Sequence, residues 1–244
     1  MKDYEPVMSF GEEVAERDRR SAGRGDEDAA VAFLEALAGD GPALELAIGT
    51  GRIALPLAAR GIRVDGIDIS PHMVAQLRKR PGGDDIAVTM GDFADVAVAG
   101  SYRLIYVVFN TLFNLLTQDD QVRCFQNVAA HLTDDGSFVI EGYTPAYLYR
   151  RPDPGNVRAE AVEVDHVWLE VDRHDPVTQT LEECHVRLSA KGVRVYPIVQ
   201  RYAWPSELDL MARIAGLRLK QRWGGWDRTP YAATSSNIVS VYGR

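Results

Sequence analysis

The chain has 244 residues, of which 46% are hydrophobic and 25% charged. This is ordinary usage for a globular protein and excludes wholesale disorder, and the length suffices for one α/β domain with a small insert. The count of 27 Lys and Arg against 35 Asp and Glu gives a formal net charge of -8, and such an acidic surface disfavours a nucleic-acid substrate.

Cysteine usage and apolar patterning predict a cytosolic protein. Cys124 and Cys184 lie far apart and form neither a metal motif nor a redox motif, so we expect free thiols in a reducing compartment. The polar residues from Met1 to Glu5 lack the apolar stretch of a secretory signal, and no later apolar run is long enough to span a bilayer. No membrane partner is expected.

The first 41 residues are interpreted as an N-terminal segment and one helix. The segment is charged and weakly patterned up to about Gly25, and Ser21 to Asp26 indicates a flexible stretch. Apolar side chains then recur at helical spacing from Val31 to Ala38.

From residue 42 onward, short apolar runs alternate with helical patterns. Ser70 and Pro71 predict a helix start, and Thr117 with Asp120 has the spacing of a capping box. Asp134 to Gly136 predicts a turn before the fifth strand. We expect strands at 42–48, 63–69, 86–90, 104–109 and 138–141, and helices at 53–60, 70–81 and from Thr117 onward.

This alternation predicts a doubly wound, Rossmann-like sheet, because parallel neighbours need crossover helices on both faces. After Gly142 the helices stop, and 162–171, 181–188 and 193–203 predict an antiparallel β insert after the fifth strand. A helix at 205–215 and a hairpin of 217–223 with 237–242 would complete seven strands. The core would comprise residues 42–145 and 204–244, and the insert, residues 146–203, would be an acceptor lid or a dimer interface.

Glycines follow the first strand, at Gly49 and Gly51. They would let the backbone approach a ligand, although a structural turn or a nicotinamide site produces the same pattern. Three acidic residues in chain order favour a ligand-binding role: Glu45 inside the first strand, Asp68 at the end of the second, and Asp92 after the third. A carboxylate at the end of the second strand can accept both hydroxyls of a ribose.

In this order the motifs resemble the class I S-adenosylmethionine-dependent methyltransferases. The resemblance covers about residues 44–141 and, in outline, 202–242, and segments 49–58 and 109–116 are similar to small-molecule methyltransferases of actinobacterial type. It implies S-adenosylmethionine as cofactor and methyl transfer to a hydroxyl or amine of a small molecule.

The resemblance also implies roles for individual residues. Glu45, Gly49, Gly51 and Arg52 would hold the methionine end of the cofactor, and Asp68 the ribose hydroxyls. Around the adenine would lie Ile69, Gly91, Asp92 and Phe93, and beside the sulfonium Phe109 and Asn110. Relatives often carry a tyrosine-rich N-terminal lid, whereas Tyr4 and Phe10 are the only aromatic residues before Phe33 here.

Alignment of nucleophile and methyl group can supply most of the catalysis, and a general base is needed only for a protonated nucleophile. The candidates for such a base are His185, His166 and Tyr143. We expect no metal, because Cys184 and His185 are strand neighbours that point to opposite faces.

Other interpretations stay open. A nicotinamide-dependent oxidoreductase is disfavoured by Ala54, which stands where a dinucleotide fingerprint prefers glycine. A non-catalytic cofactor-binding protein is a second alternative. A protein or RNA methyltransferase is a third, although Asn110 to Phe113 departs from the acceptor motif often seen in that class.

Overall fold

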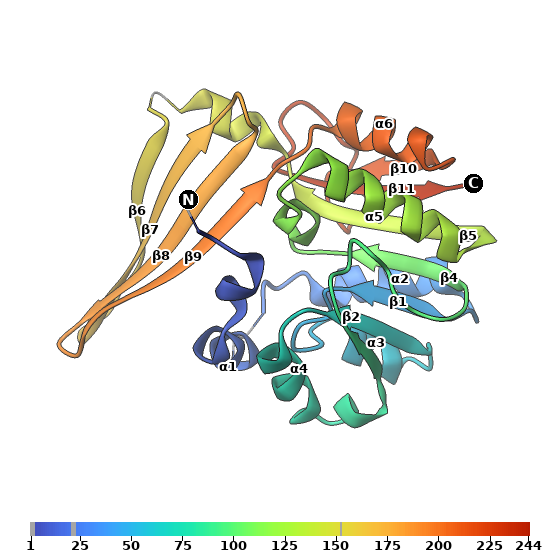
Figure 1. The fold of residues 1–244 in the computed structure, drawn as a ribbon, viewed down its shortest axis with the longest axis horizontal. Helices are drawn as coiled ribbons and strands as arrows, with labels where there is room; N and C mark the ends of the chain where they lie inside the picture. The colour runs from blue at the N-terminus through green and yellow to red at the C-terminus, as the bar shows by residue number, and fades with distance from the viewer. Residues whose placement is uncertain (1–2, 21–22, 152) are drawn as a thin grey trace.

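The computed structural model describes residues 3–20, 23–151 and 153–244. The described chain forms two sheets (Figure 1): a larger one layered with helices, and a four-stranded one that extends from it as a separate arm. The N-terminal segment lies between the two.

The larger sheet has seven strands in the order β10-β11-β5-β4-β1-β2-β3. Neighbours among the first five strands of the chain pair in parallel, while β11 pairs antiparallel with both β5 and β10. The predicted fold class is thereby confirmed. The strands are β1 (Ala43–Leu46), β2 (Val64–Asp68), β3 (Ala87–Met90), β4 (Tyr102–Val107), β5 (Leu132–Tyr143), β10 (Arg218–Trp223) and β11 (Asn237–Gly243).

Helices cover both faces of this sheet, as the alternation predicts. One hydrophobic cluster joins the sheet to α2, α3 and α4, and a second joins it to α5 and α6. The hydroxyls of Ser70 and Thr117 accept backbone N–H groups of Met73 and Asp120, at 3.2 and 3.1 Å, so both predicted helix starts are confirmed. The helices are α2 (Glu27–Ala38), α3 (Ala54–Ala59), α4 (Pro71–Arg78), α5 (Gln118–His131) and α6 (Pro205–Ile214).

The turn predicted at Asp134 to Gly136 is wrong. Strand β5 begins at Leu132, directly after α5, and contains these residues. Between Tyr102 and Leu104 of β4 the pairing partner moves from Leu132 to Ser137, so the intervening residues form an irregularity inside the strand.

The insert is an antiparallel sheet in the order β6-β7-β8-β9. Three of these strands were predicted from the sequence, whereas β6, a mostly exposed edge strand, was not. Its bounds are β6 (Gly155–Val162), β7 (His166–Asp175), β8 (Thr180–Ser189) and β9 (Gly192–Arg201).

A short 3₁₀ helix, Pro6–Phe10, and α1 (Glu12–Arg20) connect the two sheets. The Ser9 hydroxyl donates to the Pro197 carbonyl of the insert at 2.6 Å, and the Phe10 carbonyl accepts from the Ser70 hydroxyl of the core at 2.6 Å. We call residues 4–20 the strap. Of the stretch expected to be flexible, Ser21 and Ala22 lie outside the described residues.

The sequence predicts free cysteine thiols and no membrane-spanning helix. Cys124 and Cys184 are free thiols. Among the helices of the described residues, none has the length and apolar character that a bilayer crossing requires.

Candidate functional site

A cavity of about 540 Å³ lies beyond the carboxyl ends of β1, β2 and β4, where open α/β sheets bind their ligands. Three parts of the chain enclose it. The core supplies most of the wall, the strap supplies Phe10 and Asp18, and β8 and β9 of the insert supply His185 and Gln200.

The loop after β1 forms the floor of the cavity. Ala47, Gly49 and Gly51 all have left-handed backbone conformations, with φ of 57°, 57° and 77°. Gly49 lines the cavity, and a Cβ atom there would meet no atom within 4 Å. Gly51 does not line it: a Cβ atom there would lie 2.4 Å from Leu77 Cδ1, so this glycine is required by the packing of the loop on α4.

Asp68 joins the floor to the second strand. Its Oδ2 accepts the Gly49 N–H at 2.7 Å and its Oδ1 the Ser70 N–H at 2.8 Å. The carboxyl group is buried, which raises its pKa, and it lines the cavity with acceptor capacity left on both oxygens. Beside it Ile69 is 42% exposed toward the same cavity, an apolar surface suited to a planar base.

Glu45 lies at the buried base of the cavity. It accepts the Tyr106 hydroxyl at 3.1 Å, and burial raises the pKa of its carboxyl to about 8. A cationic ligand group nearby would favour its ionised form.

Two arginines bring positive charge to the strap side. Arg52 pairs with Asp18, and the Thr50 hydroxyl donates to the same carboxylate at 2.6 Å. The guanidinium carbons of Arg24 and Arg52 lie 4.8 and 5.0 Å from the ring centre of Phe109. Arg24 and Asp18 could not be predicted from the sequence, because neither belongs to a motif.

The third strand contributes Asp92 and Phe93, and both line the cavity. Asp92 Oδ1 accepts the Ala94 N–H at 2.8 Å, which fixes the carboxylate at the start of its loop. Gly91 does not line the cavity. Its N–H donates to the Asp68 carbonyl at 2.9 Å and extends the pairing of β2 with β3.

After β4, Phe109 and Asn110 both have left-handed backbones, with φ of 58° and 64°. Such strained residues often mark functional sites. Phe109 lines the cavity, whereas the Asn110 amide oxygen accepts the Tyr143 N–H at 2.7 Å and is committed to β5. Asn114 in the same loop does line it, and its Oδ1 is buried without a hydrogen-bond partner among the described residues.

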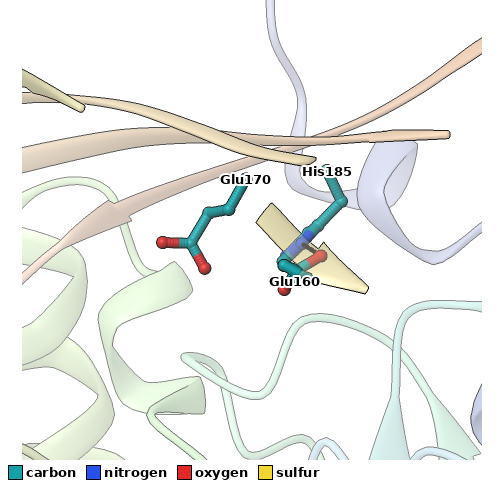
Figure 2. Close-up of side chains that lie close together, drawn as sticks. All are labelled: Glu160, Glu170 and His185. Atoms are coloured by element: carbon teal, nitrogen blue, oxygen red, sulfur yellow. Dashed lines mark hydrogen bonds and ion pairs between the residues drawn. The ribbon is translucent and has the colours of Figure 1, made fainter. Parts of the chain in front are cut away.

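Of the three candidate bases, the structure brings only His185 to the cavity. Its Nδ1 lies 2.9 Å from Glu160 Oε2 and its Nε2 lies 2.9 Å from Glu183 Oε1 (Figure 2 shows the Glu160 contact). The hydrogen bond with Glu183, followed by that with Glu160, raises the pKa of His185 against the opposing effect of burial.

The other two candidates lie elsewhere. His166, at the start of β7, pairs with the exposed Asp165. The Tyr143 ring packs edge-on against Phe113 and Tyr147, and its buried hydroxyl has no partner among the described residues.

These features fit the adenosine and methionine parts of S-adenosylmethionine. Asp68 offers two oxygens to the ribose hydroxyls, Ile69 and Asp92 offer an apolar surface and an acceptor to an adenine, and Arg52 offers a cation to a carboxylate.

Comparisons with known proteins agree with this fit. The model of a methyltransferase domain matches residues 43–136. The structure of the CcbJ methyltransferase from Streptomyces caelestis is 36% identical, with a TM-score of 0.91, over 98% of this chain and 99% of that one. The cypemycin N-terminal methyltransferase of a Streptomyces species is 27% identical over 82% of each chain.

A more distant structure shares the fold. The amino pentose methyltransferase CalS10 from Micromonospora echinaspora, solved with bound S-adenosylmethionine, is 21% identical with a TM-score of 0.68, over 94% of this chain and 95% of that one.

Fold and site together define a class I methyltransferase. The chain belongs to the S-adenosylmethionine-dependent methyltransferases, and its cofactor is S-adenosylmethionine. This assignment removes the nicotinamide-dependent oxidoreductase as an alternative.

Proposed function

We propose that this enzyme methylates a hydroxyl or amine of a small molecule that enters between the core and the insert. One observation carries the proposal: a single cavity is lined both by the core residues proposed to hold the cofactor and by His185, Ile198 and Gln200 of the insert. A molecule seated against the insert would therefore share the space that the cofactor's reactive end reaches.

The cofactor roles follow the residues that line the cavity. Asp68 would hold the ribose, Asp92 and Phe93 the adenine with Ile69 packed on it, and Phe109 would lie toward the reactive end. The residues proposed to contact the cofactor all line the cavity: Glu45, Gly49, Arg52, Asp68, Ile69, Asp92, Phe93 and Phe109. Gly51, Gly91 and Asn110 would act through the loop geometry described above rather than by direct contact.

When bound, S-adenosylmethionine supplies a methyl group whose bond to sulfur breaks, with its electron pair left on sulfur, as the acceptor's lone pair forms the new bond. The residues of the chain then have two tasks: to align the acceptor and to remove its proton where it arrives protonated. We assign the second task to His185, the one candidate base that lines the cavity.

The names of two related proteins support a small-molecule acceptor. One is named for methylating the N-terminus of cypemycin. Another, from Streptomyces fradiae, is named as an N,N-dimethyltransferase of a dTDP-linked amino sugar and is 29% identical over 49% of this chain. Both names describe methylation at nitrogen, and the net charge of -8 is unfavourable for a nucleic-acid acceptor.

The domain roles follow from this arrangement. Residues 42–145 with 204–244 would bind the cofactor, and residues 146–203 would cover the acceptor. We place the enzyme in the cytosol, because its two free cysteines suit a reducing compartment.

The test has two stages. Calorimetry with S-adenosylmethionine and S-adenosylhomocysteine should give saturable binding, and NAD should give none. A screen with methyl-labelled cofactor against amines, alcohols, peptides and RNA should then label a small molecule. Labelling confined to protein or RNA, or cofactor binding with no transfer to any acceptor of these classes, would contradict the proposal.

A further inference from the structure

The insert places acidic side chains around His185, which lines the cavity. Glu160, Glu170 and His185 come from three adjacent strands, β6, β7 and β8, and extend from the sheet toward the core (Figure 2). One ligand atom of each lies within 4.8 Å of the others. With Glu183, which also bonds His185, we call these residues the carboxylate cluster.

The cluster has more negative than positive charge. Its three carboxylates face two possible cations: Arg158, which pairs with Glu170, and His185 when protonated. Even then one negative charge stays unbalanced among these groups. Because His185 lines the cavity, that charge acts on whatever occupies the acceptor side.

This electrostatic environment discriminates between nucleophiles. A hydroxyl must develop negative charge as it loses its proton, and nearby carboxylates oppose that. An ammonium group enters with positive charge and several N–H donors, which carboxylates bind well. The cluster is less suited to bind a metal ion, because both imidazole nitrogens are already paired with carboxylates and Glu170 is paired with Arg158.

A second observation, on a core residue of the same cavity, points to the same ligand. Asn114 lines the cavity, and its buried Oδ1 has no hydrogen-bond partner among the described residues. An unpaired buried acceptor is costly, and a ligand N–H would satisfy it. An amine can donate to this oxygen and to a carboxylate together, whereas a hydroxyl has one proton to donate.

We propose that the acceptor is an amine that binds as an ammonium ion at the carboxylate cluster, with Glu160 and Glu183 selecting its charge and His185 taking its proton. This inference rests on the proposed function and names its acceptor class. The ammonium replaces the imidazole on the Glu160 carboxylate, and the displaced imidazole releases its Nδ1 proton to solvent, which leaves it neutral with its remaining proton on Nε2 toward Glu183. One N–H bond of the ammonium then breaks, its proton passes to the vacant Nδ1, and the electron pair stays on the amine nitrogen as the attacking lone pair.

The experiment uses the full chain saturated with S-adenosylhomocysteine, so that the cofactor site is demonstrably loaded before any acceptor probe is added. The probes are benzylamine, which is protonated at neutral pH, and benzyl alcohol. The readout is the His185 imidazole resonance, assigned among the five histidines by its loss in His185→Gln.

Benzylamine should shift the His185 resonance saturably, and benzyl alcohol should leave it unchanged. The double variant Glu160→Gln/Glu183→Gln should bind benzylamine at least about tenfold more weakly, a loss of about 1.4 kcal/mol, because the ammonium loses its charged hydrogen-bond acceptors. Glu182→Gln is the matched control: Glu182 lies beside Glu183 in β8, pairs with Arg173, and should not change benzylamine binding. If the double variant does not fold, Glu160→Gln alone should show the same direction.

Three outcomes would overturn the inference: no response to benzylamine in the loaded protein, equal responses to the two probes, or equal affinity in wild type and the Glu160→Gln variants. In the labelled-methyl screen, a product methylated on oxygen would overturn it too. Failure of S-adenosylhomocysteine to bind would instead contradict the proposed function, so the two failures are distinguishable.

Discussion

Glu45 and Tyr106 form a hydrogen bond of 3.1 Å between adjacent strands, at the buried base of the cofactor cavity. Both side chains are almost fully buried. Burial raises the pKa of Glu45 to about 8 and that of the Tyr106 hydroxyl well above its ordinary value. Burial therefore favours the neutral form of the Glu45 carboxyl group at the base of the cavity.

This relationship predicts a pH-dependent stability. The folded pKa of Glu45, about 8, exceeds its ordinary value of 4.5, so the folded state binds the extra proton. The associated stability is complete below about pH 4.5 and is lost as the pH rises through 8. Glu45→Gln, which imitates the neutral form, should lose less stability over this range, by an amount on the order of 3–5 kcal/mol.

Urea unfolding at pH 5, 7 and 9 measures the effect on Glu45. Glu35→Gln is the control, because Glu35 forms an exposed ion pair with Arg60 and should not change the slope. Parallel pH profiles for wild type and Glu45→Gln would show that the carboxyl ionises freely in the fold.

Asp68 should be needed both for the cofactor and for the fold. Asp68→Ala removes the acceptor proposed for the ribose and leaves the N–H groups of Gly49 and Ser70 without their partner. Each unpaired buried donor costs about 1–3 kcal/mol, so stability and affinity should both fall. Asp68→Asn, which keeps one acceptor oxygen, should fall between Ala and wild type.

Thermal unfolding and calorimetry together separate the two roles of Asp68. The exposed Asp84 supplies the control, and Asp84→Asn should match wild type in both measurements. A stable Asp68→Ala protein with full cofactor affinity would contradict the role proposed for this carboxylate.

The parts of the site predictable from sequence are those fixed by strand ends. Asp68 and Asp92 follow parallel strands that all end at one edge, so their place at the cavity follows from the strand pattern alone. The same reasoning failed to separate Phe109 from its neighbour Asn110, because a left-handed turn directs one side chain to the cavity and the other to β5.

The carboxylate cluster of the insert was not predictable from sequence. Glu160 and Glu183 resemble ordinary solvated residues of exposed strands, and what makes them notable is that β6 and β8 bring both to His185. Cross-strand register depends on turns and bulges, including the one in β6 between Ala159 and Ala161. For the strap, Asp18 is one of many charges in an unpatterned segment, and its contacts with the core depend on tertiary structure.

Gly51 should be required by packing and Gly49 mainly by its backbone conformation. A side chain at Gly51 meets Leu77 Cδ1 at 2.4 Å in a left-handed backbone, whereas the space around Gly49 is open. Gly51→Val should therefore lose about 2–5 kcal/mol of stability, and Gly49→Ala about 1–2 kcal/mol.

Urea unfolding of both glycine variants checks this order. Two more proteins, Leu77→Ala and Gly51→Val/Leu77→Ala, test the cause: removing the Leu77 side chain should make Gly51→Val less damaging than it is in the wild-type background. Equal stability losses at Gly49 and Gly51, or additive losses at Gly51 and Leu77, would rule out the packing explanation.

The strap should control how long the cofactor stays bound. Phe10 and Asp18 line the cavity, and the Asp18 carboxylate accepts from the Thr50 hydroxyl at 2.6 Å and pairs with Arg52. Asp18→Asn weakens this attachment, so the strap should open more often. We expect cofactor dissociation to become about tenfold faster, the effect of roughly 1.4 kcal/mol.

Stopped-flow release of S-adenosylhomocysteine measures the dissociation rate of the Asp18→Asn variant, and hydrogen exchange of residues 4–20 reports opening of the strap. Thr50→Val removes the other side of the contact, so the double variant with Asp18→Asn should add little to either single change. Glu12→Gln, at an exposed position of the same helix, is the control. The Asp18 contacts hold the strap on the core and do not stabilise the core itself. The free energy of global unfolding should therefore change by less than about 1 kcal/mol. A variant with faster exchange in the strap but an unchanged release rate would show that the strap opens without gating the cofactor.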